Sequence, residues 1–313
     1  MKLSIVTPIY NEVENLPGLF REIKSSLSAL GWDYEIIAVN DGSVDGSLNV
    51  LKELAAVDSH IKIISFSRNF GQTAALSAGF THATGEVIIP LDADLQNDPR
   101  DIPLLLSKLA EGYDIVSGWR KNRHDKLISR KIPSRLANSL IGKITGVKLH
   151  DYGCTMKAYR KESLDSVRLY GEMHRFIPAL AAWHGAKITE VVTNHRPRQF
   201  GQTKYGIRRT FKVVLDLLTV KFLTNYSTRP MHFFGKAGLY ALSAAVISGL
   251  LALYLRLFHH VSLIITPLPL LTVFLMLVGL QFILMGLIAE MLTRVYYETQ
   301  NKPTYFIKEK INF

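Results

Sequence analysis

The chain has 313 residues, with 37 Lys or Arg against 26 Asp or Glu, and its formal net charge is +11. This charge favours an anionic partner: nucleic acid, a phosphorylated substrate or an anionic membrane face. The chain has long apolar segments and no nucleic-acid motif. A membrane is therefore the better prediction, and nucleic acid is not expected. The one cysteine, Cys154, excludes a disulfide within the chain and a metal site built from cysteines.

Short apolar runs alternate with segments of helical spacing through the first 120 residues. The apolar runs predict strands at residues 3–7, 34–39, 61–66, 86–91 and 115–118. The spaced segments predict helices at residues 14–30, 47–56, 72–82 and 99–111. This alternation predicts an α/β fold in which a parallel sheet carries helices on both faces. Ligands of such sheets bind beyond the carboxyl ends of the strands.

The apolar run from Val87 to Leu91 ends in an unusual polar motif. Asp92 and Asp94 are one residue apart, and the amide of Gln96 follows. Carboxylate and amide oxygens suit a hard divalent cation. An acidic turn that only caps a helix is the plainer alternative, but two carboxylates so close repel each other unless a cation or donors compensate. The motif therefore predicts a metal site made of Asp92, Asp94 and Gln96.

A basic stretch follows the last of these strands. It contains Arg120, Lys121, Arg123, Lys126, Arg130, Lys131 and Arg135. Such a run is either a solvated loop or a loop that binds phosphate, and the sequence favours neither strongly.

Two long apolar segments, at about residues 233–257 and 263–292, predict a transmembrane hairpin. Each is long enough to cross a hydrocarbon core of about 30 Å. Positive charges flank the outer ends of the pair more densely than the connection between them, which predicts that both termini lie in the cytosol. Residues 208–226 carry an apolar stripe among basic residues and predict a helix on the membrane surface, although core packing explains the stripe nearly as well.

These segments divide the chain into four predicted parts. Residues 1–207 form a cytosolic catalytic domain, 208–231 an amphipathic interface helix and linker, 232–293 two transmembrane helices, and 294–313 a cytosolic tail. The apolar run at the N-terminus is too short for a signal peptide, so we expect the first domain to stay in the cytosol.

Four motifs in this order carry a family resemblance. Residues 7–12, 40–43, 68–72 and 92–96 together resemble family 2 glycosyltransferases of the GT-A, Rossmann-like fold. Residues 151–154 and 200–205 and the C-terminal hairpin are similar to the polyprenyl-phosphate glycosyltransferases. That group includes bactoprenol glucosyltransferases, dolichol-phosphate mannose synthases and undecaprenyl-phosphate aminoarabinose transferases.

The resemblance implies a role for each matched residue on the donor side. Pro8, Tyr10, Glu12 and Asp41 would surround the base and ribose of a nucleotide-sugar. Asp92 would contact the region of the ribose and the metal, and Asp94 and Gln96 would coordinate Mg²⁺ or Mn²⁺ on the diphosphate.

On the acceptor side, the resemblance implies that Lys204 lies near phosphate. Arg120, Arg130 and Arg135, with Arg198 as a weaker candidate, would contact the acceptor phosphate or the leaving diphosphate, because the guanidinium fork matches phosphate oxygens. Asp151 would orient the acceptor or act as its base, and a simple turn residue is an equally good interpretation.

The implied reaction is inverting, metal-dependent transfer of a hexose onto undecaprenyl or another polyprenyl phosphate at the cytosolic face of the inner membrane. A lipid phosphate has a second pKa of about 6 and is already an anionic nucleophile at neutral pH. Glucose from UDP-glucose is the first expectation for the sugar, with GDP-mannose, UDP-N-acetylglucosamine and UDP-aminoarabinose left open. The expected partners are the two substrates, the lipid bilayer, further copies of the chain, and a downstream flippase for envelope or lipopolysaccharide glycosylation.

Two other functions are weighed against this one. A processive polysaccharide synthase usually carries a Gln-x-x-Arg-Trp motif, where this chain reads His174, Arg175 and Phe176, and two spans cannot form its channel. A non-catalytic scaffold that binds nucleotide-sugar would not need the intact acidic motif.

Overall fold

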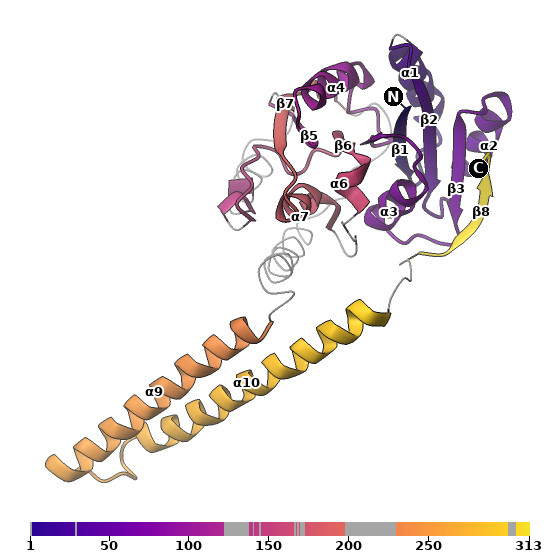
Figure 1. The fold of residues 1–313 in the computed structure, drawn as a ribbon. Helices are drawn as coiled ribbons and strands as arrows, with labels where there is room; N and C mark the ends of the chain where they lie inside the picture. The colour runs from indigo at the N-terminus through magenta and orange to yellow at the C-terminus, as the bar shows by residue number, and fades with distance from the viewer. Residues whose placement is uncertain are drawn as a thin grey trace. The chain divides into compact units, whose positions relative to one another are not determined.

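The computed structural model describes residues 2–28, 30–121, 138–139, 141–143, 145–165, 167, 169, 173–197, 230–299 and 305–313 (Figure 1). The chain divides into two compact units, one of Met1–Val220 with Pro303–Phe313 and one of Lys221–Lys302. The predicted interface helix at 208–226 lies outside the described residues, as do Arg130, Arg135, Arg198 and Lys204.

The first unit contains an eight-stranded sheet in the order β7-β5-β6-β4-β1-β2-β3-β8. Its strands are β1 (Lys2–Ile9), β2 (Asp33–Asn40), β3 (Ile61–Phe66), β4 (Val87–Pro90), β5 (Ile115–Trp119), β6 (Lys157–Arg160), β7 (Ile188–Val192) and β8 (Ile307–Ile311). The prediction of a parallel sheet is wrong for two strands. β6 lies between β4 and β5 and is antiparallel to both, and β8 is antiparallel to β3.

Helices cover both faces of this sheet, as predicted. They are α1 (Leu16–Ser28), α2 (Ser47–Val57), α3 (Gln72–His82), η1 (Pro99–Asp101), α4 (Ile102–Ala110), α6 (Lys161–Asp165), η3 (Met173–Phe176) and α7 (Ile177–Trp183). Apolar residues of α1, α2 and α4 share one buried cluster with alternate strand residues such as Leu3 and Ile5. Successive strand residues face opposite sides of a sheet, so Val6 faces away from that cluster. Helix α3 packs closely against Val6 on this second face, since a Cβ atom at Gly79 would lie 2.2 Å from Val6 Cγ1.

A buried carboxylate, Glu35 in β2, ties three strands to the turn before β4. It accepts hydrogen bonds from the hydroxyl of Ser4 at 2.6 Å and from the backbone N–H of Thr84 at 2.6 Å, and its other oxygen lies 2.7 Å from Lys62 Nζ. Burial alone would raise the pKa of Glu35, but the contacts with Lys62, Ser4 and Thr84 outweigh it and lower the pKa from 4.5 to about 2.

Glu35 should therefore give the fold a dependence on acid. Its folded pKa lies below its unfolded one, so its stabilisation is complete above pH 4.5 and is lost as the pH falls towards about 2. We expect Glu35→Gln to lower the free energy of unfolding by about 3 kcal/mol near neutral pH. The difference between wild type and variant, measured by denaturant unfolding in detergent, should shrink steadily below pH 4.5. A difference that does not change with pH would contradict the ionic role of Glu35.

The second unit is a hairpin of α9 (Pro230–Phe258) and α10 (Leu268–Thr299). Two stretches, Phe234–Phe258 and Leu268–Ala289, have mean hydropathies of 1.9 and 2.5 and are long and apolar enough to cross a membrane. The two helices approach closely at small residues, since a Cβ atom at Gly238 would lie 2.8 Å from the carbonyl oxygen of Gly279. The second helix begins at 268 rather than at the predicted 263.

Candidate active site

The residues predicted to bind the donor lie at the end of the sheet where its central parallel strands have their carboxyl ends. β1, β2 and β4 are parallel neighbours, so their carboxyl ends meet there. The loops after β1 and β2 bind each other: Asn11 Oδ1 accepts from the N–H of Val44 at 2.9 Å, and the hydroxyl of Ser43 accepts from the N–H of Asn11 at 3.0 Å. Pro8 is half-buried and Tyr10 is exposed beside them. Glu12 accepts a hydrogen bond from the side-chain amide of Asn15 at 2.6 Å.

Asp41, directly after β2, holds the segment that follows β3. Its carboxylate accepts from the backbone N–H groups of Phe70 at 2.6 Å and Gly71 at 2.9 Å, and from the side-chain amide of Asn69 at 3.0 Å. Burial raises the pKa of Asp41, and the two backbone N–H groups oppose that rise. We call residues 67–72 the donor loop. Asp41 organises this loop, and its contact with a nucleotide base stays a prediction.

Glycine is required where the turn after β2 meets the donor loop. Gly42 has a φ of +66°, and a Cβ atom there would lie 2.4 Å from the carbonyl carbon of Arg68. The two backbones can therefore approach this closely only without a side chain at residue 42.

The acidic motif after β4 alternates in exposure. Asp92, Asp94 and Gln96 are half-buried, while the apolar residues between them are buried in the core. The chain turns within the motif, with Leu95 at a φ of +58°, and the core leaves these three oxygen-bearing side chains partly exposed. Two carboxylates and an amide fit a hard cation by their chemistry. The described residues contain no group of three or more His, Cys, Asp or Glu side chains placed to hold a metal, so the assignment depends on the amide of Gln96 as the third ligand and stays a prediction.

Asp92 links the donor loop to the other side of the site. Its Oδ1 accepts from Gln72 Nε2 at 2.8 Å, and its Oδ2 accepts from the hydroxyl of Thr155 at 2.7 Å. Burial raises the pKa of Asp92, while the Thr155 hydroxyl and the charges of Arg120 and Lys157 oppose that rise. Asp94 accepts from the backbone N–H of Gln96 at 3.2 Å, which fixes the turn of the motif.

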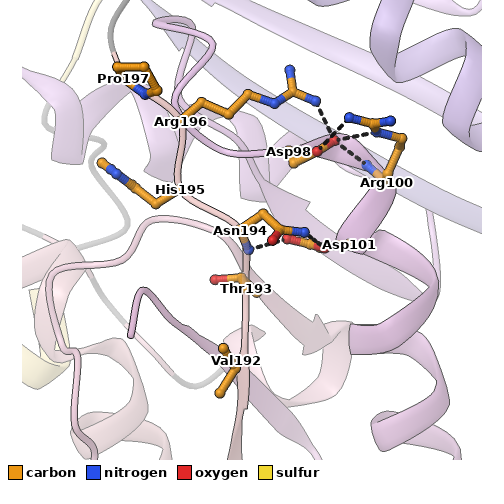
Figure 2. A pocket seen from close by; sticks show the side chains of 9 residues that line it. All are labelled: Asp98, Arg100, Asp101, Val192, Thr193, Asn194, His195, Arg196 and Pro197. Carbon is orange, nitrogen blue, oxygen red and sulfur yellow. Dashed lines mark hydrogen bonds and ion pairs between the residues drawn. The ribbon is translucent and has the colours of Figure 1, made fainter. Parts of the chain in front are cut away.

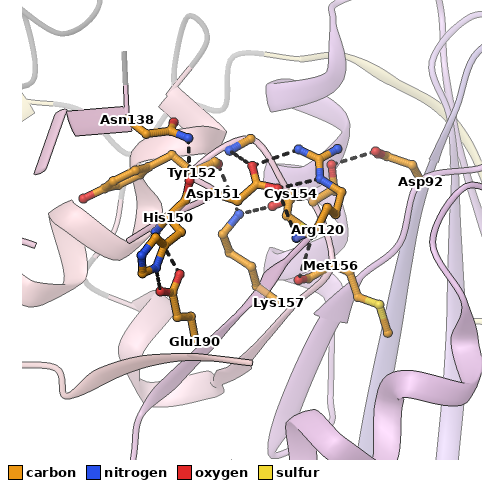
Figure 3. Close-up of polar contacts among 12 residues, drawn as sticks. Asp92, Arg120, Asn138, His150, Asp151, Tyr152, Cys154, Met156, Lys157 and Glu190 are labelled. Carbon is orange, nitrogen blue, oxygen red and sulfur yellow. Dashed lines mark hydrogen bonds and ion pairs between the residues drawn. The ribbon is translucent and has the colours of Figure 1, made fainter. Parts of the chain in front are cut away.

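Figure 3 shows Asp151 and Arg120 as a two-point ion pair beside Asp92. Arg120 Nε lies 2.7 Å from Asp151 Oδ2, and Nη2 lies 2.9 Å from Oδ1. Burial alone would lower the pKa of Arg120, but the Asp151 carboxylate raises it. The sequence analysis assigned Arg120 to a phosphate and left Asp151 as a residue that orients the acceptor, as a base or as a turn residue. In the structure the two are partners, and Asp151 also accepts from the N–H of Gly153 at 3.0 Å, as a turn residue does.

Lys157 belongs to the same cluster and was not among the predicted site residues. It is 2 % exposed, and its amino group donates to the carbonyl oxygens of Cys154 and Tyr152. Burial lowers the pKa of Lys157. Nothing around Lys157 in the sequence signals its burial, because two of the four residues of β6 are basic and a lysine is rarely buried without partners.

An open groove of about 780 Å³ is lined by Asp98, Arg100, Asp101 and residues 192–197 (Figure 2). Arg196 was also not among the predicted site residues. Its Nη2 lies 2.7 Å from Asp98 Oδ1, and its Nη1 lies 2.7 Å from Oε2 of Glu22 in α1. Its backbone N–H donates to the carbonyl oxygen of Gln96 at 2.8 Å. Arg196 therefore connects the end of the acidic motif to α1 and to the segment that follows β7.

Comparison with known proteins agrees with this geometry. Residues 4–168 match the model of glycosyl transferase family 2. A dodecaprenyl-phosphate galacturonate synthase from Rhizobium johnstonii is 43% identical over 316 residues, which cover 99% of this chain and 93% of the relative. An undecaprenyl-phosphate 4-deoxy-4-formamido-L-arabinose transferase from an Enterobacter species is 40% identical over 312 residues, which cover 99% of this chain and 94% of the relative.

Among solved structures, glucosyl-3-phosphoglycerate synthase from Mycobacterium tuberculosis, in complex with Mn²⁺, UDP and phosphoglyceric acid, has a TM-score of 0.56 at 18% identity. The match covers 70% of this chain and 78% of that one, and it shows the GT-A fold. With the family model and two relatives that match along nearly the whole chain, the protein belongs to glycosyltransferase family 2 and is an enzyme of the branch that contains these prenyl-phosphate sugar transferases.

Proposed function

We propose that the enzyme transfers a sugar from a nucleotide-sugar to the phosphate of a polyprenyl lipid at the membrane surface. The observation that carries this proposal is the continuous network from Asp41 through the donor loop and Asp92 to Thr155, with the Arg120–Asp151 pair beside it. This supports a site in which the residues proposed for the donor lie close to Arg120, which we propose for the second anion. The two relatives described above, both named for prenyl-phosphate products or acceptors, support the lipid acceptor.

The chemistry follows from two anionic substrates. An oxygen of the lipid phosphate attacks the anomeric carbon of the sugar, a new carbon–oxygen bond forms, and the bond to the nucleoside diphosphate breaks with inversion. Pro8, Tyr10 and Glu12 would hold the nucleoside, and Asp92, Asp94 and Gln96 would hold Mg²⁺ or Mn²⁺. When bound, the cation neutralises charge on the leaving diphosphate.

Arginine and lysine side chains have the complementary task on the acceptor. Arg120, oriented by Asp151, would contact the acceptor phosphate, and Arg130, Arg135 and Lys204 would complete the anion site. The charges reduce the repulsion between the two substrates at the moment of attack. Because the lipid phosphate is already ionised at neutral pH, Asp151 serves better as the partner of Arg120 than as a base.

The donor sugar is the finer part of the proposal. The relatives' names give a galacturonate and a formamido-arabinose, and they favour a modified sugar of the aminoarabinose or uronic acid type over the glucose first expected. We place the enzyme in the cytoplasmic membrane, with the α9–α10 hairpin as its anchor and the catalytic domain and both termini in the cytosol.

A donor panel tests this function. The purified protein, reconstituted in vesicles with undecaprenyl phosphate and Mn²⁺, is incubated separately with UDP-glucuronate, UDP-galacturonate, UDP-4-deoxy-4-formamido-L-arabinose, UDP-glucose and GDP-mannose. We expect a lipid product whose mass equals prenyl phosphate plus one sugar, with one of the modified sugars as the best donor, and none after EDTA treatment. Preference for UDP-glucose would restore the first expectation. A product with several sugar units would contradict single transfer and favour a processive synthase.

A further inference from the structure

We propose that Phe306, near the start of the C-terminal segment (Tyr305 to Phe313), is a positioning residue of the donor site through its contact with the donor loop. The proposal rests on the proposed function, because it concerns the affinity for the nucleotide-sugar. It assigns a role to a part of the chain that the sequence marked only as a tail.

The far part of the C-terminal segment is fixed to the catalytic domain. β8 pairs with β3 from Ile63 to Phe66. The side-chain amide of Asn312 donates to the carbonyl oxygens of Ala55 and Ile61, each at 2.9 Å. Lys52 of α2 lies 3.0 Å from Glu309. The segment is therefore an integral strand of the sheet, and its first residues have a defined position.

Those first residues contact the start of the donor loop. The ring of Tyr305 stacks on Phe66, with centroids 5.1 Å apart and an angle of 18°. The carbonyl oxygen of Phe306 accepts from the backbone N–H of Ser67 at 3.3 Å. The ring of Phe306 lies 6.2 Å from the ring of Phe70.

On its other side, the donor loop contacts Asp41 and Asp92, the two carboxylates proposed to bind the donor. The backbone N–H groups of Phe70 and Gly71 donate to Asp41, and Gln72 donates to Asp92. The donor loop is thus held between the C-terminal segment and the two carboxylates. A shift of Phe70 away from Phe306 would move the N–H groups that orient Asp41.

A simple edge strand would explain β8 but not Phe306. Covering the edge of β3 needs backbone pairing and no aromatic side chain beyond the strand. Phe306 is 73% exposed, so its ring adds little to the core, yet it lies against the one aromatic ring of the donor loop. Arg68 also places its guanidinium 4.2 Å from the centroid of Phe70, so Phe70 has contacts with the segment, with Arg68 and with Asp41.

The test compares Phe306→Ala with Phe313→Ala in the full-length protein. Both rings are exposed and belong to the C-terminal segment, but Phe313 contacts His82, Lys62 and Lys310 rather than the donor loop. We expect Phe306→Ala to raise the KM for the nucleotide-sugar about fivefold and to leave the KM for prenyl phosphate within about twofold. Phe313→Ala should change neither constant, and both variants should keep the melting temperature of the wild type.

A second readout needs no substrate. Hydrogen exchange of the peptide covering the donor loop should be faster in Phe306→Ala than in Phe313→Ala. If the wild type transfers no sugar, the proposed function fails but this exchange measurement still decides the positioning role. Equal exchange in the two variants would overturn the inference and leave β8 as an edge strand only. So would a change in Phe306→Ala that is equal for the KM of the nucleotide-sugar and the KM of prenyl phosphate.

Discussion

Replacing Asp94 with Asn is expected to reduce sugar transfer about a thousandfold while the protein stays folded. Asp94 accepts a hydrogen bond from the backbone N–H of Gln96, two residues further on, at 3.2 Å. An Asn side chain can still accept that bond, so the turn should persist. What it loses is the negative charge that a divalent cation requires.

Three measurements decide this prediction. Transfer rates are compared at saturating donor and acceptor, Mn²⁺ affinity is titrated calorimetrically in the presence of UDP, and folding is checked by the melting temperature without metal. Glu111→Gln is the matched control, because it also exchanges an acid for its amide but lies at the end of α4 and pairs with Lys108. We expect the control to match the wild type. Normal transfer by Asp94→Asn would show that the acidic motif does not hold the metal.

The fold was predictable where local pattern decides structure. The expected strand at 61–66 and helix at 72–82 coincide with β3 and α3, since an apolar run or a helical spacing is complete within each. β6 was missed because it has four residues and pairs with β4 about seventy positions earlier in the chain, as Val87 opposite Arg160 shows. β8 was missed because its partner is also distant in the sequence: Ile311 lies opposite Ile63 of β3, and only the folded structure brings them together.

The site was predictable in its location but less so in its contacts. Parallel strands bring their carboxyl ends together, so Asp41 and Asp92 could be placed at one edge from the sequence. Residue type cannot tell whether a guanidinium faces a phosphate or a carboxylate, because both accept its forked hydrogen bonds. Arg120 and Asp151 are 31 positions apart, and no local pattern joins them. Lys157 and Arg196 escaped prediction because their partners are carbonyl oxygens or distant acids.

Asp151→Asn is expected to have the second large effect, on stability and activity together. It would leave the guanidinium of Arg120 buried without its carboxylate, in a cluster that already contains Lys157. We expect a loss of about 3 kcal/mol in the free energy of unfolding and about a hundredfold loss of transfer, because Arg120 would no longer be oriented. Denaturant unfolding and steady-state transfer measure the two effects.

The double variant Arg120→Gln/Asp151→Asn separates them. With both charges removed, the buried pair becomes two neutral amide side chains that can bond to each other. We expect most of the lost stability to return, since an unpaired buried charge costs more than the pair contributes. Transfer should stay low, because the double variant still lacks the guanidinium. Recovery of both properties would show that neither residue contacts the acceptor.

The pH dependence of transfer then distinguishes an orienting Asp151 from a base. A lipid phosphate loses its second proton at a pKa of about 6. If Asp151 removed that proton, Asp151→Asn would be slow below pH 6 and would recover as rising pH ionises the acceptor without help. If Asp151 orients Arg120, the defect lies in the position of a charge that does not titrate, and the variant should stay slower by the same factor from pH 5.5 to 8.5. The two-point contact between Asp151 and Arg120 predicts the constant factor, because a carboxylate with both oxygens bound to a guanidinium is a poor proton acceptor.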